Sequence, residues 1–210
     1  KRIYEEPDIN IENKLIKTLR TIIKNNKSIN LSLLSEILNI PTFSEIESEI
    51  KKINPLKIYK TIDELNYLFG TKLKVELLNK LKEIDKKIYK IWPEGKEERK
   101  LIETIWKLLL HSKDQGIKSK IISYVDCNSM TLSKAALNVF TRINCTEREL
   151  ISNIFFEKWK NNPVVLDNWF FFKASIEIDS NQKSIEDLFK NKYFDVKSPN
   201  TLRSILNAYV

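Results

Sequence analysis

The chain has 210 residues and a formal net charge of +8; 42% of its residues are hydrophobic and 30% are charged, with three glycines and six prolines. A chain of this length can bury roughly 70% of its unfolded surface, and so few turn-forming residues favour long helices over a turn-rich β fold. No apolar run approaches the ~20 residues of a membrane-spanning helix and the start shows no secretory signal peptide, so we expect no membrane partner.

Apolar residues recur at a spacing of three and four along almost the whole chain, which is the pattern of amphipathic helices. Strand-like alternation is rare, and its best example, residues 175–179, is short. The spacing and the boundary residues predict helices near 10–26, 31–39, 44–53, 55–69, 71–91, 94–111, 114–126, 131–143, 146–161, 163–175, 181–191 and 198–210.

Several of these helix starts have a physical reason. Ser44 with Glu47, and Thr146 with Glu149, have the spacing of capping boxes, in which the hydroxyl accepts from a backbone amide and the carboxylate reaches back. Gly70 is interpreted as the end of one helix, with the next residue capping the following one. A capping side chain followed by proline at the first helical position, where a missing amide proton costs nothing, occurs at Asn54-Pro55, Asn162-Pro163 and Ser198-Pro199.

The short connections place successive helices antiparallel. We therefore predict an all-α fold: an irregular α-solenoid, a HEAT/armadillo-like superhelix of about ten to twelve antiparallel helices. Residues 1–210 are expected to form a single domain. The chain lacks an initiator Met and ends on an apolar helical pattern without a stop signal, so it is interpreted as a segment of a longer chain.

The last third of the chain carries an ordered set of landmarks. It runs Asn128-Ser129-Met130-Thr131, Ala135-Ala136-Leu137, Phe156-Glu157-Lys158-Trp159, Pro163-Val164-Val165-Leu166-Asp167-Asn168-Trp169-Phe170 and Ser198-Pro199-Asn200-Thr201-Leu202-Arg203-Ser204. This succession resembles the C-terminal helical domain of the bacterial-type aminopeptidase N branch of the M1 zinc metallopeptidases. That family runs N-N-M-T-D, A-L-x-A-L, Y/F-x-x-x-W-x-x-x-P/G-L-V-x-D-K-W-F and N-P-N-R-x-R-S-L. The resemblance covers roughly Leu34 to Val210.

The resemblance implies a zinc aminopeptidase that removes N-terminal amino acids from peptides. M1 enzymes hold zinc with His-Glu-x-x-His and a downstream Glu, and the Glu of the motif acts as general base. With His111 as its one histidine, this segment cannot hold that site, so we expect no catalytic residue and no metal ligand here. Zinc would lie in a catalytic domain of the same chain, outside this segment. Cys127 and Cys145 are interpreted as free packing thiols of a cytoplasmic protein.

Arg203 is the candidate substrate-binding residue. It matches the second arginine of N-P-N-R-x-R-S-L, which in the family faces the internal cavity where peptides lie. Two parallel hydrogen bonds could join it to a peptide carboxylate. The alternative is a structural arginine that bonds helix-end carbonyls or a neighbouring acid. Three family positions differ: Thr201 replaces the first arginine of that motif, Asn168 replaces the lysine after the family's Asp, and Leu132 replaces the Asp after N-M-T.

Other conspicuous residues have mainly structural interpretations. Trp159 and the Trp169–Phe172 cluster could stack on bases or peptide side chains, but core packing between helices is favoured. Asp167 is interpreted as a hydrogen-bonding residue between helices rather than a catalytic acid. Asn200 is expected to fix the entry of the loop into the last helix, with a substrate role as the alternative.

Two functional hypotheses follow. In the first, the segment packs over a catalytic domain, encloses the active-site chamber and gates peptide access. In the second, it is a non-catalytic basic α-solenoid that binds protein or nucleic acid along its concave face. The second needs lysine and arginine gathered on one face. The basic residues are instead scattered and interleaved with acids, and Lys, Asn and Ile are enriched together, so a nucleic-acid partner is not favoured.

Overall fold

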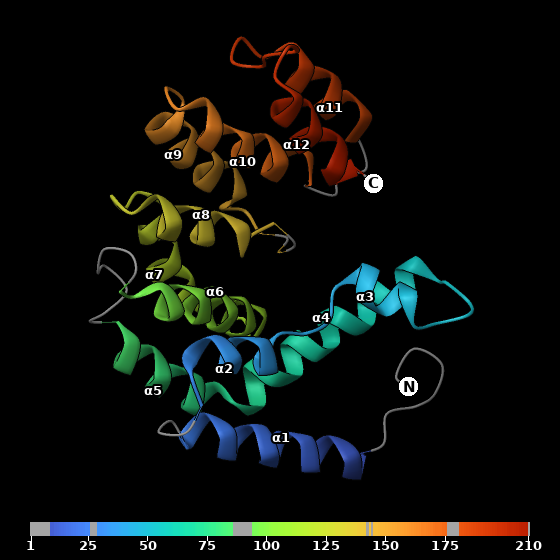
Figure 1. The fold of residues 1–210 in the computed structure, drawn as a ribbon, viewed down its shortest axis with the longest axis vertical. Coiled ribbons are helices and arrows are strands. Elements are labelled where there is room, and N and C mark those ends of the chain that lie inside the picture. Colours follow the sequence, from blue (N-terminus) through green and yellow to red (C-terminus); the bar gives the residue numbers. More distant parts are fainter. Residues whose placement is uncertain are drawn as a thin grey trace. The chain divides into compact units, whose positions relative to one another are not determined.

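The computed structural model describes residues 9–25, 29–85, 94–141, 143, 145–175 and 181–209, and every regular element among them is a helix (Figure 1). These are α1 (Ile9–Lys24), α2 (Leu31–Leu38), α3 (Phe43–Ser48), α4 (Pro55–Lys72), α5 (Lys74–Ile84), α6 (Lys96–His111), α7 (Gln115–Val125), α8 (Met130–Asn138), α9 (Arg148–Trp159), α10 (Pro163–Ala174), α11 (Asn181–Phe189) and α12 (Pro199–Tyr209). The all-helical prediction is confirmed. The predicted helical stretch 86–91 and most of the alternating stretch 175–179 lie outside the described residues.

The chain divides into two compact units, unit 1 (Lys1–Ile117) and unit 2 (Lys118–Val210). Whether the two behave as one domain in the protein stays a prediction. No helix in the described ranges combines the length and apolarity needed to cross a membrane.

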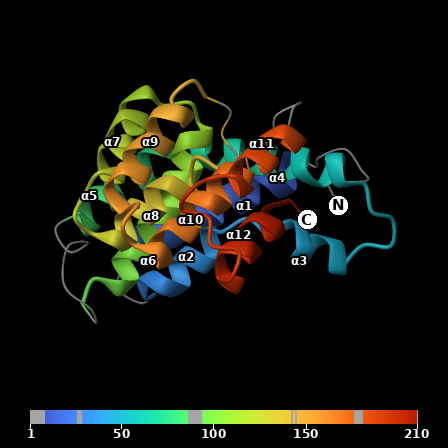
Figure 2. The ribbon, with the colours of Figure 1, turned by 90° about the horizontal axis from the view of Figure 1, so that it is seen from above.

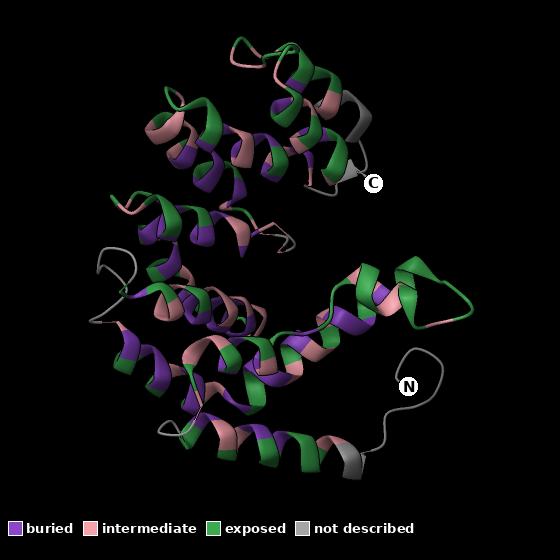
Figure 3. Ribbon diagram, viewed as in Figure 1, coloured by how far each residue is buried: buried purple, intermediate pink, exposed green. Residues whose placement is uncertain are grey.

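Unit 1 is built around α6. This helix packs against α2, α4 and α5, while α1 packs on α5 and α2, and α3 packs on α4. The apolar stripe of α6 is almost wholly removed from solvent (Figure 3): its buried residues are Leu101, Ile102, Ile105, Trp106, Leu108, Leu109 and Leu110. Burying such a stripe on three sides supplies the main driving force for folding this unit.

Gly70 does not end a helix, contrary to the prediction. Helix α4 continues through it to Lys72, and α5 begins after Leu73 without a side-chain cap, so Thr71 caps nothing. A Cβ at Gly70 would come within 2.0 Å of the Leu108 carbonyl oxygen on α6. The glycine is therefore explained by close approach of two helix backbones, which local sequence does not distinguish from a helix stop.

Unit 2 is built around α10, which packs against α8, α9, α11 and α12. Five of its buried residues are large and apolar, and three of those are aromatic; the buried set is Val165, Leu166, Trp169, Phe170, Phe172 and Ala174. Apolar residues cover most of the circumference of α10. This pattern is typical of an interior helix that has neighbours on several sides. Each unit thus has one central helix, α6 or α10, against which several other helices of the same unit pack.

The three proline-associated helix starts are confirmed. The Asn54 side chain accepts from the Lys57 amide at 3.1 Å, and the Asn162 side chain accepts from the Val165 amide at 3.3 Å. Ser198 likewise accepts from the Thr201 amide at 3.4 Å. Each bond satisfies an amide that the first helical turn leaves without an intrahelical partner.

Both predicted capping boxes are wrong in detail. The box at α3 is formed by Thr42 with Glu45, two residues before the predicted pair, because the helix begins at Phe43. At α9 the Thr146 hydroxyl donates to the neighbouring Glu147 carboxylate, and the cap position makes no side-chain bond. Pairs with the right spacing occur at adjacent registers, and spacing alone does not choose between them.

Candidate functional site

A polar contact joins the start of α12 to α10. The Thr201 hydroxyl donates to Asp167 Oδ1 at 2.7 Å, and Thr201 itself is buried. Asp167 is thus a hydrogen-bonding residue between helices, as predicted. Asn200 is exposed in the first turn of α12, while Ser198 forms the cap. Thr201, which stands where the family motif has its first arginine, is therefore a buried residue that joins α12 to α10.

Arg203 lies two positions beyond Thr201, which places it about 200° around the helix from the buried contact. Its side chain is exposed, and no hydrogen bond or ion pair engages its guanidinium within the ranges that the structure describes. In the structural alternative, Arg203 would bond a helix-end carbonyl or a neighbouring acid. Neither contact is present among the described residues. The geometry leaves five N–H donors directed away from the packed face of α12. Its substrate role stays a prediction.

Aromatic rings join α9, α10 and the α11–α12 connection. Phe156 on α9 lies 4.8 Å from Trp169 and 5.3 Å from Tyr193, measured between ring centroids. Phe170 contacts Phe194 edge-on at 5.9 Å. Such edge-to-face pairs are favourable beyond the area they bury. The core interpretation is confirmed for Trp169, Phe170 and Phe172, which are buried, whereas Phe171 is 38% exposed and Trp159 is only half-buried.

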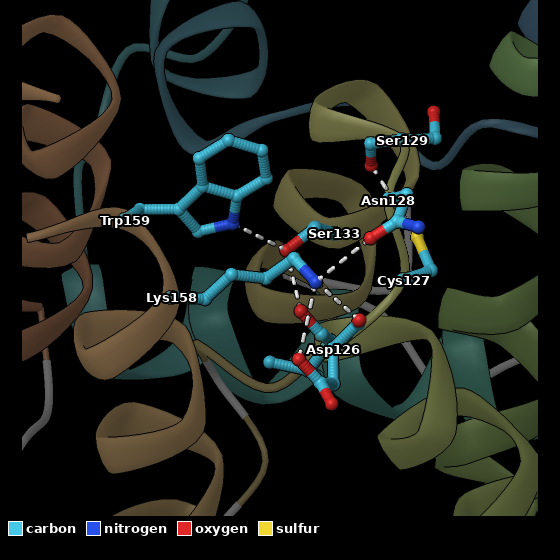
Figure 4. A network of polar contacts seen from close by, with 8 residues as sticks. Asp126, Cys127, Asn128, Ser129, Ser133, Lys158 and Trp159 are labelled. Atoms are coloured by element: carbon cyan, nitrogen blue, oxygen red, sulfur yellow. Dashed lines mark hydrogen bonds and ion pairs between the residues drawn. The ribbon is translucent and has the colours of Figure 1, made fainter.

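A polar network that sequence reasoning missed pins the α7–α8 turn to α9 (Figure 4). The Lys158 ammonium donates to the Asp126 carbonyl oxygen at 2.5 Å, to Asp126 Oδ1 at 3.1 Å and to Asn128 Oδ1 at 3.3 Å. Three acceptors from one turn satisfy all three ammonium protons. The signal was present in the sequence, since Asn128 and Lys158 belong to two of the landmark segments, but their contact crosses 30 residues.

The neighbouring residues extend this network into the core. Trp159 Nε1 donates to the Ser133 hydroxyl at 3.0 Å, and Ser133 in turn donates to the Val125 carbonyl oxygen at 2.6 Å. Cys127 Sγ lies 3.3 Å from the Ser129 carbonyl oxygen, and burial raises the pKa of its thiol. A thiol with a raised pKa is a poor nucleophile at neutral pH. The network is therefore suited to holding the α7–α8 turn against α9 and not to catalysis.

A family model described as "Domain of unknown function (DUF3458_C) ARM repeats" matches residues 1–210. The chain belongs to this ARM-repeat family. It is 24% identical over 186 residues to Aminopeptidase N of Escherichia coli (strain K12), which covers 88% of this chain and 21% of that protein. It is also 24% identical over 194 residues to Aminopeptidase N of Haemophilus influenzae, with 92% and 22% covered.

Among solved structures, aminopeptidase A of Legionella pneumophila in complex with aspartic acid has a similar fold. The TM-score is 0.78 at 21% identity, over 92% of this chain and 24% of that one. The chain thus spans about a fifth of the length of the curated relatives it matches. Together with the ARM-repeat match, these likenesses confirm the α-solenoid class and the resemblance to the C-terminal domain of aminopeptidase N.

The zinc of that resemblance does not fit the residues of this ARM-repeat chain. Within the described residues, no three His, Cys, Asp or Glu side chains gather closely enough to hold a metal ion. His111 Nδ1 lies 2.8 Å from the Lys107 carbonyl oxygen, and its Nε2 lies 3.7 Å from Asp63 Oδ1.

Ion pairs hold several of the basic side chains of both units. In unit 1, Lys74 contacts Asp114 at 2.6 Å; in unit 2, Lys118 contacts Glu147 at 2.7 Å and Lys173 contacts Glu149 at 2.8 Å. A lysine paired with a carboxylate contributes little to a field that attracts phosphate. These pairs agree with the interleaved charges of the sequence and give no support to a nucleic-acid interface.

A shallow hollow of about 270 Å³ lies between α2 and α6 in unit 1. In its lining, the Ser35 hydroxyl lies 2.9 Å from the Thr104 hydroxyl, and Lys100 contacts Glu36 at 2.6 Å. Four of its polar side chains are thus engaged with one another. We assign it no chemistry.

Proposed function

We propose that this chain is the C-terminal superhelical segment of a zinc aminopeptidase that removes N-terminal amino acids from peptides. The observation that carries this proposal is the ARM-repeat match over residues 1–210, together with two relatives named Aminopeptidase N. In this proposal the catalytic domain, with its zinc, lies elsewhere in the same polypeptide. The free thiols Cys127 and Cys145 suit a cytoplasmic location.

The role of the segment itself is architectural: it encloses the active-site chamber and gates the access of peptides. A wall of this kind must keep its shape when substrate arrives. Three side-chain hydrogen bonds that join helices of unit 2 support such stiffness: Trp159 to Ser133, Trp169 to Ser152 and Thr201 to Asp167. Enclosure also removes water and strengthens electrostatic contacts to the substrate.

Within that wall, Arg203 binds the C-terminal carboxylate of the peptide. Its exposure, and the absence of an internal partner among the described residues, support this role. The Thr201–Asp167 bond fixes the first turn of α12 and therefore the position from which Arg203 reaches out. A guanidinium recognises a carboxylate through two parallel hydrogen bonds, which an amide cannot reproduce.

The activity is tested on the full-length protein with alanyl and lysyl chromogenic amides, with and without a zinc chelator. We expect release of the chromophore that the chelator abolishes and added zinc restores. A well-folded, zinc-loaded protein that hydrolyses neither substrate would contradict the aminopeptidase assignment.

The role of Arg203 is tested with tripeptides bearing a free C-terminal carboxylate and with the corresponding C-terminal amides. Arg203→Ala should raise KM for the acids roughly tenfold, since an exposed charge-assisted bond is worth about 1.4 kcal/mol, and leave the amides unchanged. Arg203→Lys should recover part of the loss. Lys197→Ala removes an exposed charge just before α12 and is the matched control. Equal effects on acids and amides would rule out carboxylate recognition.

A further inference from the structure

The connection between α3 and α4 forms a projecting tip. All seven residues of this tip, Lys51–Lys57, are exposed, and α3 contributes no buried residue to unit 1. Both ribbon views place the hairpin at the outer edge of unit 1 (Figures 1 and 2). The tip therefore adds almost nothing to the core of the unit that carries it.

The tip is nevertheless built as an ordered structure. The capping box of Thr42 and Glu45 fixes the start of α3, and Asn54 caps α4. The rings of Phe43 and Tyr59 stack with centroids 4.9 Å apart, which holds α3 against α4. Groups that are fixed before binding lose less conformational entropy when a partner covers them. The arrangement suits a preformed docking element.

Two large apolar side chains are presented at this tip. Leu56 is 84% exposed and Ile53 is 51% exposed. The corresponding position of α10, Val164 after Asn162-Pro163, is also exposed at 76%, but polar residues precede it. A single exposed apolar residue is ordinary, whereas two that lie three positions apart in a basic segment have the composition of an interface.

The charges around these residues indicate the chemistry of the partner. Lys51 is exposed just before Ile53, whereas Lys52 and Lys57, which lie on either side of the apolar pair, also interact with other groups of the chain. The N-terminus of the 18-residue helix α4 adds its partial positive charge at the same place. Glu47 and Glu49 lie before the tip at the end of α3, so residues 51–57 themselves are purely basic. An apolar pocket rimmed by carboxylates is complementary to this surface.

We propose that the Lys51–Lys57 tip docks into a carboxylate-rimmed apolar pocket in the part of the same polypeptide outside residues 1–210. This proposal rests on the proposed function, in which a catalytic domain shares the chain. The relatives are four to five times longer than their matched region, since this chain covers 21% and 22% of them. A segment that walls a chamber needs fixed contacts to the remainder, and the tip is a preformed surface suited to that purpose.

The experiment measures maleimide labelling of Leu56→Cys in the full-length protein, natively and in urea, with peptide mapping to separate other cysteines. Because Leu56 is so exposed in the segment, the substitution should leave the fold of unit 1 intact. We expect native labelling to be slower than in urea by at least roughly tenfold, as for a site that opens only by local separation. Val164→Cys is the reference for an exposed residue at the same helix position.

Labelling of Leu56→Cys at the rate of the urea-treated protein would overturn the proposal. Protection that appears only when phosphatidylserine vesicles are added would overturn it too, because the occupant would then be a membrane.

Adding Lys51→Glu to Leu56→Cys should raise native labelling several-fold while Lys51→Arg does not; equal rates would refute the carboxylate rim. An inactive protein with a protected tip would contradict the aminopeptidase assignment alone, and an active protein with an unprotected tip would contradict the docking alone.

Discussion

The two units use different means to bury a central helix. In unit 1, α6 is covered mainly by aliphatic side chains, and at Gly70 the backbone of α4 comes close enough that one added carbon would touch the Leu108 carbonyl. In unit 2, α10 carries its own aromatic rings into the core: Trp169 packs against Phe156 of α9, and its Nε1 donates to Ser152 of α9 at 2.8 Å. Close backbone packing leaves no room for added volume, whereas aromatic packing leaves donors that must be satisfied.

This difference predicts opposite sensitivities. Unit 1 should be most sensitive to substitutions that add atoms, and unit 2 to substitutions that remove a hydrogen-bond acceptor while barely changing volume.

Gly70→Ala should produce the largest loss of stability. The new Cβ would lie 2.0 Å from the Leu108 oxygen and 2.8 Å from its carbonyl carbon, and backbone atoms of two packed helices cannot yield as a side chain can. We expect the free energy of unfolding to fall by about 3 kcal/mol or more, measured by urea denaturation. Gly116→Ala, whose Cβ would meet only the Asp114 carboxylate at 3.3 Å, should change it by less than about 1 kcal/mol. Similar values for the two variants would refute the close-approach explanation.

Ser152→Ala should come next. It removes the acceptor of the buried Trp169 Nε1 proton while deleting only one oxygen atom. An unsatisfied buried donor costs about 1–3 kcal/mol, so urea unfolding should show a loss in that range. The exposed Ser123→Ala, which breaks only a local bond to the Lys120 carbonyl, should cost less than about 0.5 kcal/mol. A stability loss for Ser152→Ala no greater than that for Ser123→Ala would show that the tryptophan finds another partner.

The ion pair between Lys118 and Glu147 should give the smallest effect, and a pH-dependent one. The hydrogen bond from the Lys118 ammonium lowers the pKa of Glu147 from its ordinary value of 4.5 to about 2. Because the folded pKa is depressed, its stabilisation is fully present above pH 4.5 and is lost as pH falls toward 2. The difference in thermal midpoint between wild type and Glu147→Gln should therefore shrink on acidification. A difference that stays constant from pH 6 to pH 3 would contradict this assignment.

Much of the fold was predictable from the sequence because helix boundaries depend on local chemistry. Asn54, Asn162 and Ser198 each cap the helix that follows them, as their proline neighbours indicated. The errors occurred where a contact distant in sequence decides the outcome. The local pattern predicts a helix end at Gly70, but the residue that explains this glycine, Leu108, is 38 positions away and cannot be found from local pattern.

The candidate site divides in the same way. The landmark segments identified the family. The structure shows that residues of these segments form polar contacts between helices or turns, namely Lys158 with Asn128 and Thr201 with Asp167. Their order along the chain could be read as a pattern, but their pairing could not, because hydrogen bonds across 30 or 34 residues depend on how helices pack.

The helical class, most helix positions and the family follow from short segments of sequence, because periodicity, caps and ordered landmarks are all local patterns. The choice of central helices, the need for glycine at position 70 and the outward direction of Arg203 on α12 depend instead on how the helices pack. These depend on which surfaces meet, and that is fixed by burial of apolar area and satisfaction of buried polar groups over the whole unit.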